Sequence, residues 1–360
     1  MSTLPAMTIQ VFGLIEILVV AILFYLMPSL TRPSLFFGVT VDPAFRRSHA
    51  GNVTIRRYRM IVVAGTCLSL VETFSCLKPG NPARGWMPVV TVLAAGIIAY
   101  LDAHRRIVPH ASVPDPQREA MLVPHRDRLP GGWAMQLSPF VLLAAAGVWL
   151  GTHWYGIPER FPVHWNLHGQ PDGWATRSAW GVFGILIPGA GVCLLLLVAS
   201  IGIVRWSRRV KAAGHRGVTE QTFRRLVLGS ILVAELMVAA LTSWIGISPV
   251  IRLGNPLIGA ELIVAAGTIG LSIIIVLLIR IGQGGSKLAG DTEERPEGDR
   301  SEDHFWKAGL FYVNPSDPAI FVEKRFGIGY TLNFGNRWVW GTLLVLAAVV
   351  IIVLAVTALM

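Results

Sequence analysis

The run WGVFGILIPGAGVCLLLLVASIGIV, residues 180–204, contains no charged side chain. A helix of about 20 apolar residues spans the hydrocarbon core of a bilayer, so this run predicts a transmembrane helix. The composition of the whole chain agrees, because 53% of its 360 residues are hydrophobic and only 14% are charged. Soluble domains carry roughly 25% charged residues. The sequence therefore predicts an integral membrane protein.

Other stretches of the chain have the same length and hydropathy. Together with the first run, the expected spans are 7–28, 59–77, 86–103, 137–154, 180–204, 226–247, 256–281 and 338–359. Because the spans follow one another with no room for a sizeable soluble domain, we expect an all-α, polytopic helical membrane protein with about eight transmembrane helices.

The distribution of basic residues predicts the orientation. Of the 31 lysines and arginines, the loops after the second, fourth and sixth spans hold only Lys78, Arg84, Arg160, Arg177 and Arg252. Cytoplasmic loops carry the excess of Lys and Arg, so both termini are expected to be extracytoplasmic. The net charge of +10 is then a topology signal. We expect membrane lipids as partners and no nucleic acid.

The spans divide the chain into regions of different composition. A segment rich in glycine and charge before the last span is expected to be disordered, because it lacks large apolar residues. The expected regions are a three-helix membrane region (1–136), a four-helix membrane region (137–282) with an extracytoplasmic loop (155–178), a disordered cytoplasmic linker (283–303), a juxtamembrane cytoplasmic element (304–337) and a last transmembrane helix (338–360).

The juxtamembrane element has a texture of its own, with many aromatic residues and glycines. The turn signal NPSDP, residues 314–318, predicts two short extended or amphipathic pieces joined by a turn. FFGVTVDPAF (36–45) and RFGIGYTLNF (325–334) share an aromatic–Gly–aliphatic pattern on the same predicted face of the membrane. We expect the segments 32–47 and 304–337 to pack together, with the glycines allowing close backbone approach rather than forming a phosphate loop.

The extracytoplasmic loop contains the most unusual stretch, FPVHWNLHGQPDGW, residues 161–174. Three interpretations stay open. Its prolines and glycines can hold a fixed turn at Pro-Asp-Gly, with Asp172 capping a helix that begins near Ala175. His164, His168 and Asp172 have the spacing of metal ligands on one helix face, but the glycines and Pro171 disfavour a helix there, so no metal is expected.

The third interpretation is recognition of a ligand by exposed aromatic and polar side chains at the mouth of the helix bundle. The candidate ligand-binding residues of the loop are His164, Trp165, Asn166, His168, Asp172 and Trp174.

The loop also carries a family resemblance. PERFPVHWNLHGQPDGW, residues 158–174, resembles the loop signature of the SdpI-like family of bacterial membrane proteins, and residues 305–336 resemble a C-terminal segment of relatives of unknown function. The family positions are matched by Pro158, Pro162, His164, Trp165, Asn166, Gly169, Pro171, Asp172 and Trp174.

The resemblance implies a multi-pass protein of the bacterial cytoplasmic (inner) membrane. The family includes an immunity protein against a secreted killing peptide, in which protection is coupled to holding a repressor at the membrane. By resemblance we expect immunity or signal transduction here, with a cytoplasmic regulator as partner. The chain departs from that family in its additional spans and its C-terminal segment.

Four acidic residues fall inside expected spans: Glu16, Glu72, Glu235 and Glu261. A charge at the bilayer centre costs about 2.5–3.5 kcal/mol, so such residues face a cavity, pair with another group or are protonated. All four are expected in the middle or extracytoplasmic part of the membrane, where they can line one outward cavity for a cation, a proton path or a basic peptide. Alternatively, each acid reaches interfacial water or forms a hydrogen bond between helices.

These observations predict a function class. We expect an immunity- or sensor-type protein that recognises a peptide or small ligand at the extracytoplasmic loop. The alternative is a cation- or proton-coupled transporter that uses the intramembrane glutamates. No Ser-His-Asp, Cys-His or HExxH arrangement is found in the sequence, so we expect neither an enzyme nor a cofactor.

Overall fold

The computed structural model of the chain describes residues 4–75, 87–112, 128–165, 171–207, 215–251, 257–283, 287, 303–344 and 347. Most of these residues are helical, as their apolar runs predict. The helices are α1 (Leu4–Leu30), α2 (His49–Ser75), α3 (Met87–Ile107), α4 (Gly132–Thr152), α5 (Ala179–Phe183), α6 (Leu186–Trp206), α7 (His215–Ile251) and α8 (Leu257–Ile281).

Within this part of the chain, four helical segments are long and apolar enough to cross a membrane: Met87–His110, Gly132–Thr152, Ala179–Trp206 and Gln221–Ile251. They establish a helical membrane protein. The count of eight spans and the orientation of the termini stay predictions.

The other expected spans have different outcomes. The described apolar parts of α1 and α8 are shorter, at Ile17–Leu30 and Ala265–Ile281. α2 is a long helix that begins before the expected span and carries Arg56, Arg57 and Arg59. In the expected last span, residues 337–344 are helical and most of the remainder lies outside the described residues.

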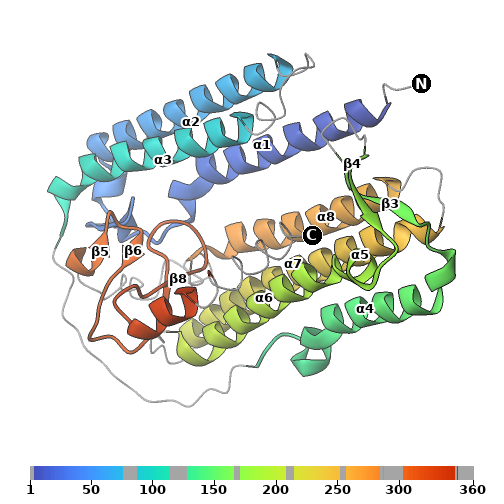
Figure 1. Cartoon of the computed structure of the whole chain (residues 1–360). Helices are drawn as coiled ribbons and strands as arrows, with labels where there is room; N and C mark the ends of the chain where they lie inside the picture. Colours follow the sequence, from blue (N-terminus) through green and yellow to red (C-terminus); the bar gives the residue numbers. More distant parts are fainter. Residues whose placement is uncertain are drawn as a thin grey trace.

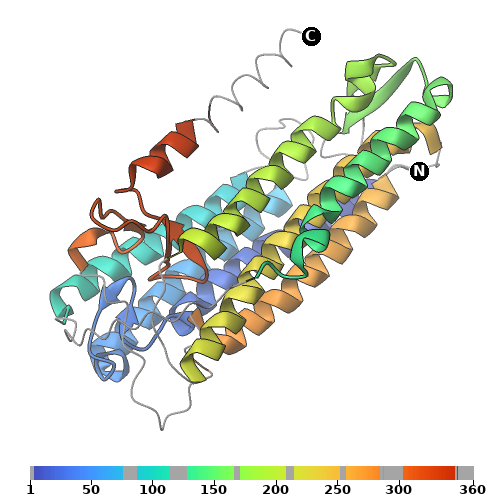
Figure 2. The same ribbon diagram turned by 90° about the horizontal axis from the view of Figure 1, so that it is seen from below.

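The helices lie side by side along one common direction (Figure 1). α1, α2 and α3 contact one another and form the first group of helices. α7 contacts α4, α6 and α8, and these four form the second group. The view from below shows the same alignment of the long helices (Figure 2). Such packing buries apolar side chains between helices and leaves an apolar surface for lipid, as the exposed Ile98, Val141 and Val148 illustrate.

The all-α expectation needs a correction, because the described residues also form two-stranded antiparallel hairpins. Each hairpin lies between helices, where a short strand pair satisfies backbone groups that a helix no longer pairs. The strands are β1 (Leu35–Phe36), β2 (Val39–Thr40), β3 (Arg160–Trp165), β4 (Pro171–Thr176), β5 (Trp306–Lys307), β6 (Phe311–Tyr312), β7 (Phe321–Glu323) and β8 (Tyr330–Leu332).

The hairpins gather at opposite ends of the helix bundle. β3 and β4 lie at one end, and β5, β6 and β8 lie at the other (Figure 1). We call residues 160–176 the loop hairpin and residues 303–336, which contain β5–β8, the cap. Short extended pieces joined by turns were expected in the cap, and the structure confirms them.

The expected packing of the segment 32–47 on the cap is also confirmed. Phe37 stacks on Phe326, with the two ring centroids 5.7 Å apart. Tyr58 of α2 and Tyr100 of α3 complete this aromatic cluster, all of it buried. The cluster thus joins the cap to the first three helices.

The expected disordered linker lies largely outside the described residues, but its two ends do not behave as a linker. The side-chain amide of Gln283 donates to the Gly329 carbonyl at 3.1 Å, and its carbonyl accepts from the Gly329 amide at 3.0 Å. Asp303 accepts from the Thr40 hydroxyl at 2.7 Å. Gln283 is therefore fixed to the cap, and Asp303 is fixed to the segment 32–47. The linker is shorter than its composition predicted.

Candidate functional site

The loop hairpin is formed by antiparallel pairing of β3 with β4, from Arg160 opposite Thr176 to Trp165 opposite Pro171. The register shifts on both sides of His164. Such irregular pairing accommodates proline and glycine, which a regular ladder excludes. The Pro-Asp-Gly sequence therefore lies in β4 and not in the turn that its composition predicted.

The capping role predicted for Asp172 is also wrong. β4 continues to Thr176, and α5 begins only at Ala179. The N-cap of α5 is Ser178, whose hydroxyl accepts from the Gly181 amide at 3.0 Å. Strand pairing of residues 171–176 delays the helix start, so the cap falls on the first suitable residue after the strand.

The base of the loop hairpin is anchored in the helix bundle. Phe161 is buried in a cluster with Leu150, Ile157 and Val182, against which Val250 of α7 packs. The guanidinium of Arg177 donates to the Ile157 carbonyl at 3.1 Å. These contacts fix the hairpin relative to α4, α5 and α7.

Close to this base, the hairpin presents an exposed aromatic side chain. The side chain of Trp174 is 49% exposed, and the Arg160 guanidinium lies over its ring, 5.1 Å from the centroid. Arg160 forms a cation–π contact with one face of the Trp174 ring, and the exposed part of the ring is available to a ligand. This places one of the predicted ligand-binding residues in a setting suited to recognition.

The other predicted loop residues are located only in part. His164 and Trp165 belong to β3 and Asp172 to β4, while Asn166 and His168 lie outside the described residues. Because His164 and Asp172 sit on two paired strands, they do not share a helix face. The one-helix arrangement considered for a metal is therefore ruled out.

The glutamates are spread over both groups of helices. Glu235 of α7 is 0% exposed, and neither of its carboxylate oxygens has a hydrogen-bond partner among the described residues. Glu72 of α2 is half-buried, and its Oε2 also has no hydrogen-bond partner among the described residues. Glu16 and Glu261 belong to α1 and α8, and their side chains lie outside the described residues. A shared outward cavity stays a prediction.

Sequence reasoning missed a buried polar network that lies in the cap. The side chain of Arg325 is 0% exposed, and its guanidinium forms an ion pair with Asp303. It also donates to the Gly38 carbonyl at 3.3 Å and lies over the Trp306 ring, 5.1 Å from the centroid. A buried charge is tolerated only when it is paired and hydrogen-bonded, as it is here.

A second ion pair in the same region joins Arg32 to Glu323. Arg46 is a third arginine of this network, and its guanidinium donates to the carbonyls of Thr31 and Arg32 at 3.3 Å. Burial lowers the pKa of Arg46 from its usual range. The sequence signal that could have found this network is the RFG sequence at 325–327, where a cation stands next to Phe326, the aromatic residue that stacks on Phe37.

The turns of β1/β2 and β5/β6 meet in the same place. Gly38 and Gly309 both have positive φ, and a Cβ built on Gly38 would lie 2.8 Å from the Gly309 Cα. The Tyr100 hydroxyl donates to the Ala308 carbonyl at 2.8 Å and fastens the contact to α3. Only glycine fits this close approach of two backbones.

The cap is equally attached to the second group of helices. The Ile320 amide donates to the Trp206 carbonyl at the end of α6 at 3.0 Å, and Ser207 forms a parallel bridge with Phe321. Arg224 of α7 donates to the Tyr330 hydroxyl at 3.2 Å. The cap therefore contacts the ends of helices from both groups.

One helix reaches both the loop hairpin and the cap. α7 has 37 residues, which corresponds to about 55 Å at 1.5 Å per residue. Its C-terminal part packs on the base of the hairpin through Val250, and Phe223 near its other end lies 6.4 Å from the Tyr330 ring. Figure 1 shows α7 running between the two ends of the molecule.

The fold and these two sites define a class: a mostly helical membrane protein with a structured hairpin at one end and a hairpin cap at the other. Two family models match parts of the chain. The Domain of unknown function (DUF1648) matches residues 140–187, which include the loop hairpin, and the Family of unknown function (DUF5808) matches residues 315–340 of the cap and the following helix. No curated protein and no solved structure matches the chain. Both regions singled out above thus coincide with uncharacterised families.

Proposed function

We propose that this protein is a membrane sensor of the immunity type, which recognises a peptide or small ligand at the loop hairpin and transmits its occupancy to the cap. The single observation that carries the proposal is the position of α7, which packs on the hairpin at one end and on the cap at the other. A ligand that shifts the hairpin relative to α7 would change the contacts of the same helix with Tyr330.

The chemistry of the hairpin supports an aromatic anchor for the ligand. Trp174 is large, rigid and half-exposed, and Arg160 adds a cation beside it. Tryptophan and arginine are the residues most often found to dominate recognition surfaces. His164, Trp165, Asn166, His168 and Asp172 are proposed to complete the ligand surface from the same hairpin.

The resemblance of the loop to the SdpI-like family supports the same proposal, and with it the proposed location in the bacterial cytoplasmic (inner) membrane as a multi-pass protein. With both termini extracytoplasmic, the loop hairpin faces outward and the cap faces the cytoplasm. A cytoplasmic regulator is then the proposed partner of the cap. The attachment of the cap to both groups of helices supports a role as the output surface.

The recognition step is tested in a deletion strain challenged with a panel of antimicrobial peptides. Complementation with the wild-type gene should restore resistance to at least one peptide. Trp174→Ala should fail to restore it, whereas Thr176→Ala, also exposed on β4, should complement. Complementation by both variants, at matched accumulation in the membrane, would exclude the hairpin as the recognition surface.

The transmission step is tested by hydrogen exchange on the purified full-length protein. The peptide identified in the complementation screen should protect residues 160–165 and 171–176 and also change exchange in the cap at residues 321–332. If the peptide protects the hairpin but hydrogen exchange in the cap does not change, the protein binds the peptide without transmitting its occupancy. That result would refute the sensor proposal.

The orientation is tested with single cysteines in a cysteine-free background. Thr176→Cys and Ser316→Cys are both exposed and lie at opposite ends of the molecule. An impermeant thiol reagent should label Thr176→Cys in whole cells and Ser316→Cys only after permeabilisation. The reverse labelling pattern would show that the cap faces outward and the loop hairpin faces the cytoplasm.

The Glu235 carboxylate has no hydrogen-bond partner in the described part of the chain, and this favours a second candidate, a cation- or proton-coupled transporter. For that function Glu235→Gln must abolish pH-dependent transport or protection, because glutamine keeps the shape but cannot carry the charge. Under the sensor proposal Glu235→Gln retains function, since the amide can replace a protonated acid in a helix interface.

A further inference from the structure

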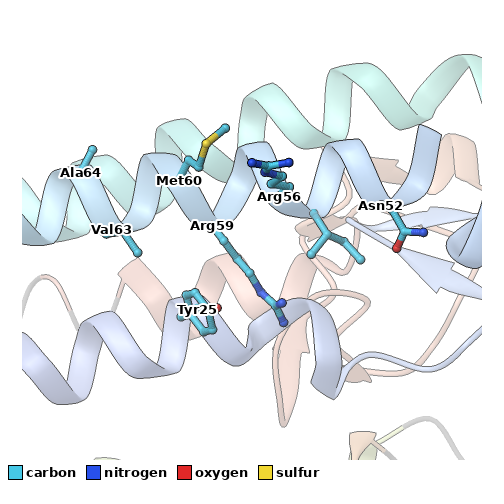
Figure 3. A pocket seen from close by; sticks show the side chains of 8 residues that line it. Tyr25, Asn52, Arg56, Arg59, Met60, Val63 and Ala64 are labelled. Carbon is cyan, nitrogen blue, oxygen red and sulfur yellow. The ribbon is translucent and has the colours of Figure 1, made fainter. Parts of the chain in front are cut away.

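A pocket of about 590 Å³ lies between α1 and α2, and no described residue of the loop hairpin or of the cap lines it. Its lining residues are Tyr25, Asn52, Ile55, Arg56, Arg59, Met60, Val63 and Ala64 (Figure 3). One end is basic and the other is apolar, and no acidic residue is part of the lining. This lining is complementary to a molecule with an anionic head and a hydrocarbon tail.

The basic end contains a guanidinium with hydrogen-bonding capacity to spare. Arg59 extends from α2 across to α1, where it lies 4.6 Å from the Tyr25 ring centroid and donates to the Ser29 hydroxyl at 3.2 Å (Figure 3). Its Nε is buried and has no partner among the described residues. Arg56 lines the same pocket one turn earlier on α2 and is exposed.

The apolar end opens to the surface that lipid chains cover. Met60 and Val63 are exposed along α2 beyond the arginines. Arginine is well suited to phosphate because its planar fork donates two parallel hydrogen bonds. An acyl chain lying along Met60 and Val63 would bring a phosphodiester to the level of Arg56 and Arg59.

A second pocket repeats the pattern at the same end of the bundle. Arg128 and Arg205 line it together with Trp133, Ile201 and Val204, and its volume is about 340 Å³. It lies where α4 begins and α6 ends, close to the attachment of the cap at Ser207. Two pockets in the described part of the chain therefore combine a pair of arginines with apolar walls.

We propose that the α1/α2 pocket binds an anionic phospholipid, with the phosphodiester on Arg56 and Arg59 and an acyl chain along Met60 and Val63. In the predicted orientation this is the cytoplasmic leaflet, which carries anionic lipid and attracts basic residues. The bound lipid would fill the gap between α1 and α2 beside the segment 32–47 on which the cap packs.

The experiment uses purified full-length protein and native mass spectrometry with phosphatidylglycerol and phosphatidylethanolamine of identical acyl chains. The wild-type protein should retain phosphatidylglycerol in preference. The variant R56Q/R59Q should lose about tenfold or more of this preference, since each basic residue near anionic lipid contributes roughly fivefold. R47Q/R105Q is the matched control, because it removes two exposed arginines that do not line the pocket.

A third variant separates the pocket from a general loss of charge or of folding. Ala64→Phe keeps both arginines and fills the apolar end of the pocket, so it should also reduce phosphatidylglycerol retention. Equal retention of both lipids by the wild type, or an unchanged preference in R56Q/R59Q and Ala64→Phe, would overturn the proposal. Displacement of the lipid by inorganic phosphate in millimolar excess would assign the pocket to a soluble phosphate ligand instead. None of these outcomes depends on ligand recognition at the loop hairpin.

Discussion

The loop hairpin and the cap are made of the same kind of element, a pair of short antiparallel strands, yet their surroundings differ. The hairpin is anchored at its base by Phe161 and leaves Trp174 exposed. The cap buries Arg325, Tyr312 and Asn333 completely and ties both groups of helices together. Buried polar networks make a structure specific and are costly to break, whereas exposed aromatic residues cost little to remove. The cap is therefore expected to maintain the fold and the hairpin to provide recognition.

The largest effect should come from Arg325→Ala. The substitution removes the ion-pair partner of Asp303 and the contacts with the Gly38 carbonyl and Trp306. We expect a loss of about 3 kcal/mol in unfolding free energy, the lower end for a broken buried pair, because Asp303 stays partly hydrated. Thermal unfolding in detergent and hydrogen exchange over residues 303–336 measure it. Arg337→Ala, an exposed cation next to the cap, is the control and should change little.

Asn333→Ala should follow closely. The Asn333 amide donates to the carbonyls of Asn314, Asp317 and Ala319 at 2.9–3.1 Å, and its oxygen accepts from the amides of Asn314 and Gly335. Loss of these bonds leaves buried backbone groups unpaired and should cost about 2–3 kcal/mol. The same unfolding measurement applies. A stability equal to that of the wild type would show that the cap does not need its internal hydrogen bonds.

A somewhat smaller effect is expected for Gly38→Ala, which tests the contact between the two turns. Its Cβ would lie 2.6 Å from the Tyr100 hydroxyl at a φ of +79°. The positive φ alone costs about 1–2 kcal/mol for a residue with a side chain. Gly191→Ala in α6 is the matched control, since a Cβ there meets no atom within 4 Å. Equal melting temperatures of the two variants would show that the contact between the two turns does not stabilise the fold.

The smallest effect on stability should be that of Trp174→Ala. The substitution removes an exposed ring and its contact with Arg160, which is worth about 0.5–1 kcal/mol at an exposed site. We expect nearly unchanged unfolding together with lost peptide resistance in cells. Unfolding as severe as that of Arg325→Ala would erase the difference between the two regions and make the loop hairpin a structural element.

The sequence predicted the parts of the fold that depend on local patterns. Long apolar runs specify membrane helices wherever they lie, and the aromatic–Gly pattern correctly paired residues 36–45 with residues 325–334. Within the loop, local rules failed. Pro-Asp-Gly favours a turn by itself, but pairing with His164 and Trp165 places it in a strand. The helix cap moved to Ser178 for the same reason.

What the sequence by itself determined is a helical membrane protein with an unusual loop, because hydropathy and length are read one segment at a time. Only the tertiary structure decided where the buried charges of the cap find their partners. Arg325 contacts the carbonyl of Gly38, which is 287 residues away along the chain. A charged residue in a polar segment looks solvent-exposed from composition alone. Its burial becomes favourable only after folding brings Asp303, Gly38 and Trp306 around one guanidinium, since each partner offsets part of the cost of leaving water.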